Sequence, residues 1–306
     1  MKRMLRRAMW FAPLLIVLIA LGCKDDPASP SIPQTEKGAW ARYTPFDWTH
    51  DGRPHESTYF TIYSDAASDE MKRQLGEIAD ERFVRILRLF DFDNVSEFVY
   101  PPGYSKMEIY INRHHAESIN WAYWGGFIFT IRSPDISGRR YESAVYIVRH
   151  ESTHVFEFLI EGRESLGTDV WFKEGIATHV GCLESTALRT IRSLSELESW
   201  ISQNQNIPGE GNPIRIHQHA DFPDGADRHE YYRLFELVVR YILDDKGMGN
   251  SYQDVVRLFY DLRDGLSFSA SFENHFGIGV SDLEDEVFDR LRAYLSTNAV
   301  PVRATD

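Results

Sequence analysis

The chain has 306 residues, 43% of them hydrophobic and 13% aromatic, so it is long and apolar enough to bury a sizeable core and is not a disordered tail. Its formal net charge is -13 at pH 7, and no basic stretch runs through the body of the sequence. This balance argues against nucleic acid as a partner and against binding to anionic lipid by charge alone.

The first 22 residues have the layout of a signal peptide. Basic residues precede an almost wholly apolar stretch at residues 8–21, which is too short to favour a membrane-spanning helix. Residues 19–23 (IALGC) resemble a bacterial lipobox, a signal that is cut before its cysteine and whose cysteine is acylated. We therefore expect an exported protein of the cell envelope, anchored to a membrane through lipid on Cys23. The alternative is an ordinary cleaved signal with an incidental cysteine.

The residues after Cys23 indicate which membrane holds the anchor and how the anchor is linked to the folded part. Lys24 stands where an aspartate marks inner-membrane retention in some bacteria, which favours the outer membrane. Residues 23–39 are rich in Pro, Ser and charge without an apolar period, so we expect a flexible tether. The remaining residues 40–306 are expected to form one domain, with a sheet lobe at about 40–160 and a helical lobe at about 161–300.

The first half of the domain predicts a β-α-β-β arrangement. Residues 57–63 (STYFTIY), 106–112 (KMEIYIN) and 126–132 (GFIFTIR) are rich in β-branched and aromatic side chains, which is typical of strands. Between the first two, Ser68 is expected to cap a long helix that runs to about Phe90, because its apolar residues keep the helical period.

From residue 141 onward the apolar pattern becomes helical. Ser251 and Ser281 each precede an acidic residue by three positions, as in a capping box, and Gly247 and Gly277 suit helix ends. The predicted fold class is therefore α+β, a mixed-sheet lobe with a long helix followed by a helical lobe. Helices are predicted at residues 141–160, 171–183, 195–203, 228–245, 251–262 and 281–295.

Residues 150–154 (HESTH) are the candidate metal-binding and catalytic motif. On a helix His150 and His154 share one face, and two neutral imidazoles suit Zn²⁺. Glu151 then lies beside the metal instead of on it, where it can take a proton from a metal-activated water as general base. The alternative is that both histidines are ordinary core or surface residues.

A catalytic zinc site needs a third protein ligand and one open position. Glu174 lies twenty residues after His154, on the next predicted helix, and the turn between the helices contains Gly162 and Gly167. Such a turn can bring the Glu174 carboxylate back against the helix that carries His150 and His154. The predicted cofactor is one zinc ion held by His150, His154 and Glu174.

At these residues the sequence resembles the gluzincin metallopeptidases, a branch of the zincins, and among them the bacterial peptidase MA-like group. Residues 171–180 (WFKEGIATHV) are similar to the family's segment of tryptophan, two residues, glutamate and glycine. The likeness covers about residues 55–298 and is strongest at 141–180. It implies a zincin-like fold, with the zinc on an active-site helix, and hydrolysis of peptide bonds in a peptide or protein substrate.

The resemblance also implies a strand that binds substrate. Gluzincins have an edge strand before the zinc helix that pairs with an extended peptide, and residues 124–129 would be that strand here, with Gly125, Gly126 and Phe127 as substrate-binding residues. The alternative is a plain buried strand with a glycine bulge.

Relatives place a Tyr or His in the later helical lobe, where it stabilises the tetrahedral oxyanion. Tyr232 is the candidate catalytic residue implied for this role, and Tyr231 and His229 are rivals. A tyrosine that only packs in the core is the alternative for the two tyrosines.

Two departures from the family pattern bear on function. Thermolysin-like members often carry an aspartate four residues after the ligand glutamate, and this chain has Thr178 there, so the support of the imidazoles must differ. Aminopeptidase members hold the substrate amine with a glutamate that ends a glycine-rich strand. No acidic residue closely follows Gly125 and Gly126, which favours endopeptidase action.

Three alternative functions are also compatible with the sequence. The protein could retain zinc but only bind a protein partner, it could be an assembly lipoprotein without zinc, or it could hydrolyse a non-peptide substrate. The intact Glu151 argues against a pure binder. Among other histidines, His114 and His115 are expected in a solvated loop, and His217 with His219 is a weaker hypothesis for a second metal pair.

Overall fold

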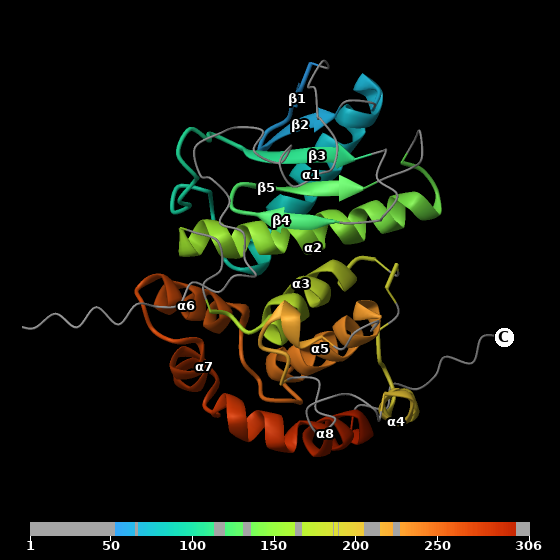
Figure 1. Cartoon of the computed structure of the whole chain (residues 1–306), viewed down its shortest axis with the longest axis vertical. Coiled ribbons are helices and arrows are strands. Elements are labelled where there is room, and N and C mark those ends of the chain that lie inside the picture. The colour runs from blue at the N-terminus through green and yellow to red at the C-terminus, as the bar shows by residue number, and fades with distance from the viewer. Residues whose placement is uncertain are drawn as a thin grey trace, which may run out of the picture.

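The chain folds into a sheet part and a helical part, as Figure 1 shows. The computed structural model describes residues 53–64, 67–112, 120–130, 136–162, 167–185, 187–188, 190–204, 215–222 and 227–297. The expected signal peptide, tether and lipidation site Cys23 lie outside these residues. The α+β class is confirmed. No helix within the described ranges combines the length and the apolar composition that crossing a membrane requires.

The strands form one five-stranded mixed sheet in the order β1-β2-β3-β5-β4. The central pairs β2/β3 and β3/β5 are parallel, whereas β1 and β4 run antiparallel at the two edges. β3 is buried along its whole length, in keeping with its central place. The bounds are His55–Glu56 for β1, Phe60–Ser64 for β2, Met107–Asn112 for β3, Trp121–Tyr123 for β4 and Gly126–Thr130 for β5.

Two long helices, α1 (Asp69–Leu89) and α2 (Arg139–Glu161), pack against one face of this sheet. The predicted cap is confirmed, because the Ser68 side chain accepts a hydrogen bond from the Met71 backbone N–H. Alternate strand residues enter the core with these helices, and the opposite face carries a smaller cluster around Tyr110. The sheet therefore fixes α2, on which the metal motif lies.

The second half of the described chain is helical and lies beyond α2 in Figure 1. Ser251 makes the predicted capping box with Asp254 at the start of α6. The bounds are Val170–Cys182 for α3, Leu194–Gln203 for α4, His219–Asp221 for the short helix η3, Arg228–Leu243 for α5, Tyr252–Arg263 for α6, Phe268–Phe276 for α7 and Val280–Thr297 for α8.

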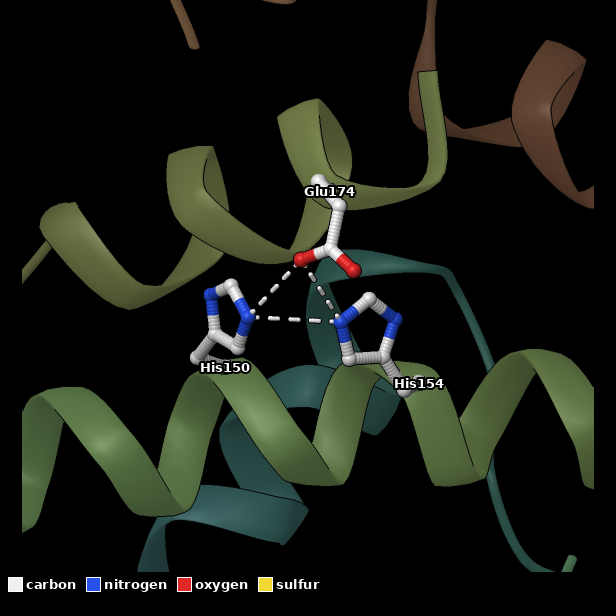
Figure 2. A group of neighbouring side chains, drawn as sticks. All are labelled: His150, His154 and Glu174. Atoms are coloured by element: carbon white, nitrogen blue, oxygen red, sulfur yellow. Dashed lines mark hydrogen bonds and ion pairs between the residues drawn. The ribbon is translucent and has the colours of Figure 1, made fainter. Parts of the chain in front are cut away.

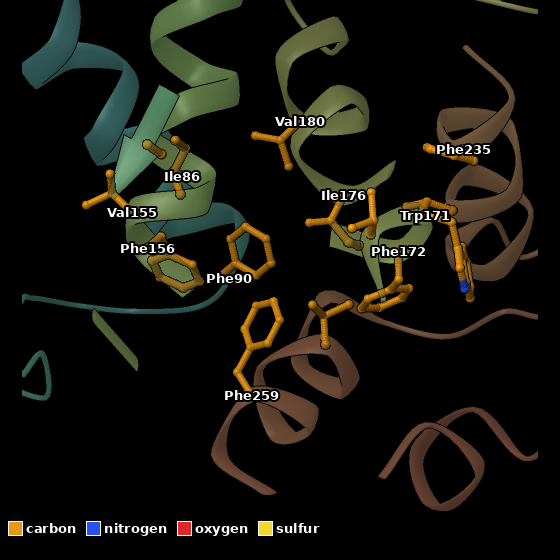
Figure 3. Close-up of a cluster of buried hydrophobic side chains, with 14 of the residues drawn as sticks. Ile86, Phe90, Val155, Phe156, Trp171, Phe172, Ile176, Val180, Phe235 and Phe259 are labelled. Atoms are coloured by element: carbon orange, nitrogen blue, oxygen red, sulfur yellow. The ribbon is translucent and has the colours of Figure 1, made fainter. Parts of the chain in front are cut away.

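One hydrophobic core joins the two parts (Figure 3). Phe90, the C-cap residue of α1, lies 4.6 Å from Phe156 of α2 between ring centroids, and α3 adds Phe172 to the same cluster. Because the core is continuous from α1 to α6, α3 is packed firmly against α2. This packing sets the distance between the two helices that carry the metal motif.

Three local predictions differ from the structure. Helix α7 was not predicted, although Ser267 caps it and Gly277 ends it. The capping box at Ser281 was wrong, because α8 begins one residue earlier, at Val280. The strand β4 was also missed, and it changes which strand lies at the edge of the sheet.

Candidate metal centre

The three predicted ligands converge on one point between α2 and α3 (Figure 2). The Nε2 atoms of His150 and His154 lie 3.3 Å apart. Oε2 of Glu174 lies 3.3 Å from Nε2 of His150 and 3.4 Å from Nε2 of His154. All three side chains are buried. The chain therefore forms a buried cluster that could hold a metal ion.

The turn between α2 and α3 explains how the carboxylate returns. Gly162 ends α2 with a left-handed backbone conformation, which reverses the chain direction. Asp169 then stands at the N-cap of α3, five residues before Glu174. A Cβ atom on Gly175 would lie 2.9 Å from the Phe235 carbonyl oxygen, so a glycine next to the ligand allows α5 to pack closely on α3.

A group of arginines fixes the far end of α3. The carboxylate of Glu184, two residues after the helix ends, lies 2.6 Å from Arg82, 2.7 Å from Arg85 and 2.9 Å from Arg149. Arg149 directly precedes the ligand His150 on α2 and is buried. These ion pairs tie α3 to both α1 and α2.

A buried polar contact also holds the middle of α3. The ring nitrogens of His179 lie 3.2 Å from the Glu236 carboxylate on α5 and 2.9 Å from the Tyr252 hydroxyl on α6. Since His179 is five residues after Glu174, this contact restrains the helix that presents the ligand.

The outward nitrogens of both imidazoles face polar side chains of α2. The Tyr146 hydroxyl lies 3.5 Å from Nδ1 of His150, and the Glu157 carboxylate lies 3.9 Å from Nδ1 of His154. Thr178, four residues after Glu174, lies beside the Tyr146 hydroxyl. The support for His150 is thus a tyrosine from the same helix, which the sequence did not predict.

Glu151 lies next to the cluster and reaches the sheet edge. The backbone N–H of Ala122 on β4 donates a hydrogen bond to its carboxylate. Burial raises the pKa of Glu151, and the neighbouring imidazoles and the Ala122 N–H oppose this effect. A carboxylate with a raised pKa is a stronger base than a solvated one, which suits proton transfer.

The charges of the cluster depend on one another. Burial alone would raise the pKa of Glu174, but His154 and His150 hold it well below its usual range. Burial alone would lower the pKa of His154, but the carboxylates of Glu174 and Glu157 raise it to about 10. The carboxylates of Glu174 and Glu157 therefore favour a positive charge at this point of the site.

Of the three candidates for oxyanion stabilisation, only Tyr232 lies at the cluster. Its ring is stacked at 6.0 Å from the ring of His150. Burial and then the charge of Glu174 raise the pKa of Tyr232 well above its usual range, so its hydroxyl keeps its proton. Tyr231 is buried in the core against Trp200, and His229 is exposed beside Asp227.

His219 is a further residue of the site. Its Nε2 lies 3.8 Å from Oε1 of Glu174, the oxygen that does not face the two ligand histidines. His217 points elsewhere and forms, with Asp169 and Glu284, a second group that could hold a metal ion, so His217 and His219 do not share one group among the described residues. The sequence signal for His219 was only its position in a loop before α5.

The predicted substrate strand needs correction. Gly125 lies in the turn between β4 and β5 with a φ of 109°, and Gly126 and Phe127 pair with Tyr123 and Ala122 of β4. Because β5 also pairs with β3, it is an interior strand. The edge strand of the described sheet on this side is β4.

Neither a protein-family model nor a curated protein sequence matches this chain.

Proposed function

We propose that this chain is a zinc metallopeptidase with a zincin-like fold of the gluzincin type, and that it acts as an endopeptidase. The observation that carries the proposal is the triangle formed by His150, His154 and Glu174, with sides of 3.3, 3.3 and 3.4 Å. In a tetrahedral site, metal bonds of about 2.0–2.1 Å place neighbouring ligand atoms about 3.3–3.4 Å apart. Two imidazoles and one carboxylate also suit zinc, and they leave a fourth position open.

A bound Zn²⁺ would polarise the scissile carbonyl and lower the pKa of a water molecule. Glu151 would accept the proton of the attacking water and pass it to the leaving nitrogen, in keeping with its place beside the ligands and its raised pKa. Tyr232 keeps its hydroxyl proton and stacks beside His150, so it would donate a hydrogen bond to the developing oxyanion.

The edge of β4 is the proposed binding site for an extended peptide. Strand addition uses backbone hydrogen bonds and makes few demands on side chains. The hydrogen bond from Ala122 to Glu151 supports this location, because it joins the edge strand to the general base. A peptide along Trp121–Tyr123 would therefore pass the metal cluster.

The test compares two carboxylates of α2. The variant Glu151→Gln should retain one zinc by elemental analysis and lose cleavage of a peptide library, whereas Glu142→Gln, exposed near the start of α2, should cleave normally. Chelator should abolish wild-type cleavage and zinc should restore it. If the wild-type protein contains zinc but cleaves no peptide, the partner-binding alternative is favoured. If it contains no zinc, the proposed metal site is refuted.

We also propose that the protein is exported and anchored through lipid on Cys23 in the cell envelope, with the outer membrane favoured. The support is the signal-like segment and the lipobox-like residues 19–23. Mass spectrometry of the purified N-terminus should find an acylated Cys23. The variant Cys23→Ser should be released from membranes.

A further inference from the structure

Arg228 on helix α5 is connected with the metal cluster through a short series of side-chain contacts. It is the first residue of this helix, and Tyr232 follows four positions later on the same face. One helical turn, about 5.4 Å along the axis, separates the two positions. Since the Tyr232 ring is stacked beside His150, Arg228 is placed one turn beyond the proposed oxyanion-binding group.

Aromatic contacts connect the guanidinium with the cluster. The Arg228 side chain lies over the ring of Phe222, with Cζ 5.2 Å from the ring centroid. Phe222 packs in turn against His219, with ring centroids 6.1 Å apart, and against Tyr232 at 6.3 Å. His219 contacts the ligand Glu174. These contacts place the cation on the α5 side of the proposed active site.

The charge of Arg228 is not neutralised by any of the described residues. Its side chain makes neither an ion pair nor a hydrogen bond with them, and the residue is exposed. The adjacent Asp227 carboxylate accepts a hydrogen bond from the His229 backbone N–H at 3.0 Å instead. Burial has the largest effect on the pKa values of Tyr232 and His219, and the positive charge of Arg228 lowers both. The field of Arg228 thus reaches two groups that border the metal cluster.

We propose that Arg228 binds a carboxylate of the peptide substrate, two or three residues from the scissile bond. This proposal rests on the peptidase function. An extended peptide rises about 3.3 Å per residue, so such a carboxylate lies about 7–10 Å from the reacting carbonyl. The net charge of -13 would repel acidic peptides in general, and an unpaired guanidinium offers a paired donor geometry for one carboxylate.

The carboxylate could belong to an acidic side chain or to the C-terminus of the substrate. Peptides of one sequence with Asp or Asn at a single position, each as free acid and as amide, separate these sources. Cleavage is measured with wild-type protein, with Arg228→Gln and with a matched control, Arg88→Gln, which is exposed at the end of α1. Binding of the same peptides to the Glu151→Gln variant gives a second readout that does not depend on turnover.

The wild type and Arg88→Gln should prefer one carboxylate-bearing peptide. The substitution Arg228→Gln should raise the KM for this peptide about ten- to a hundredfold, with little change in kcat. All three proteins should cleave peptides without that carboxylate with the same KM and kcat. Equal cleavage of acidic and neutral peptides by the wild type would overturn the role of Arg228 and leave the peptidase function intact. If the wild type with zinc cleaves no peptide, both proposals fail.

Discussion

The hydroxyl oxygen of Tyr146 lies 3.5 Å from Nδ1 of His150, the ring nitrogen that does not face Glu174. Both residues belong to α2 and are separated by one helical turn. A metal-binding imidazole is commonly oriented by a hydrogen bond to its second nitrogen. In this chain the Tyr146 hydroxyl is placed to orient the His150 ring in this way.

The variant Tyr146→Phe should weaken zinc binding. Without the hydroxyl, the His150 ring loses the contact that fixes its orientation, and such losses typically cost about 10- to 100-fold in metal affinity. Competition with a chromogenic chelator measures the affinity. Tyr260→Phe is the control, because the Tyr260 hydroxyl donates its hydrogen bond to the exposed Glu97. Equal affinities in the two variants would contradict the role of Tyr146.

His219 should act as a positioning residue for Glu174. Its ring lies 3.8 Å from the second carboxylate oxygen, so it can restrain the side chain when the first oxygen binds metal. We expect His219→Ala to retain zinc but to bind it about tenfold more weakly. His229→Ala, an exposed histidine near the start of α5, should bind zinc like the wild type. Wild-type affinity in His219→Ala would show that the contact is incidental.

The elements with strong local signals were predictable from sequence. The helix after Ser68 and the capping box at Ser251 were confirmed, because caps and helical periodicity depend on neighbours within a few residues. The convergence of His150, His154 and Glu174 was also correct, because the ligand spacing limits how two helices can meet.

The missed features depend on contacts between distant segments. β4 has three residues, too few for a periodic signal, and only its pairing with β5 makes β5 an interior strand. Likewise, the contacts of His219 with Glu174 and of Arg228 with Phe222 form only when the chain packs into its tertiary structure. At Ser281, a correct capping spacing was overridden, since α8 starts at Val280.

Removing the carboxylate of Glu184 should destabilise the fold. In Glu184→Gln, Arg82 and the buried Arg149 would face each other without the negative charge that both contact. Arg82 and Arg149 are buried but the Glu184 side chain is 30% exposed, so we expect a loss of about 2 kcal/mol in the free energy of unfolding, as for buried donors left without a partner. Urea titration measures this value.

The matched control for Glu184 is Glu198→Gln. It removes a carboxylate from the Glu198–Arg292 ion pair, in which both side chains are exposed. Exposed pairs contribute below about 1 kcal/mol, so this variant should unfold like the wild type. Similar small effects in both variants would mean that the arginines around Glu184 find solvent or other partners.

The stability of the protein should fall as the pH rises through the titration of His217. Burial opposes protonation of this ring, but the Asp169 carboxylate, 2.9 Å from Nδ1, raises its pKa above the usual value. The imidazolium is therefore favoured in the folded state. Its contribution to stability is fully present below a pH of about 6.5, the value of an unfolded histidine, and is lost as the pH rises through the higher folded pKa.

The difference between wild type and His217→Gln isolates this effect. Burial raises the pKa values of Asp169 and Glu284, and both carboxyls are present in the two proteins, so their own titration is common to both curves. Arg215 keeps its charge throughout, and titration of the metal ligands is common to both proteins and cancels in the comparison. Melting temperatures measured across neutral pH should therefore converge as the pH rises, with the wild type more stable at the acidic end. Parallel curves would show that His217 does not change its protonation in this range, and that the contact with Asp169 contributes equally at every pH.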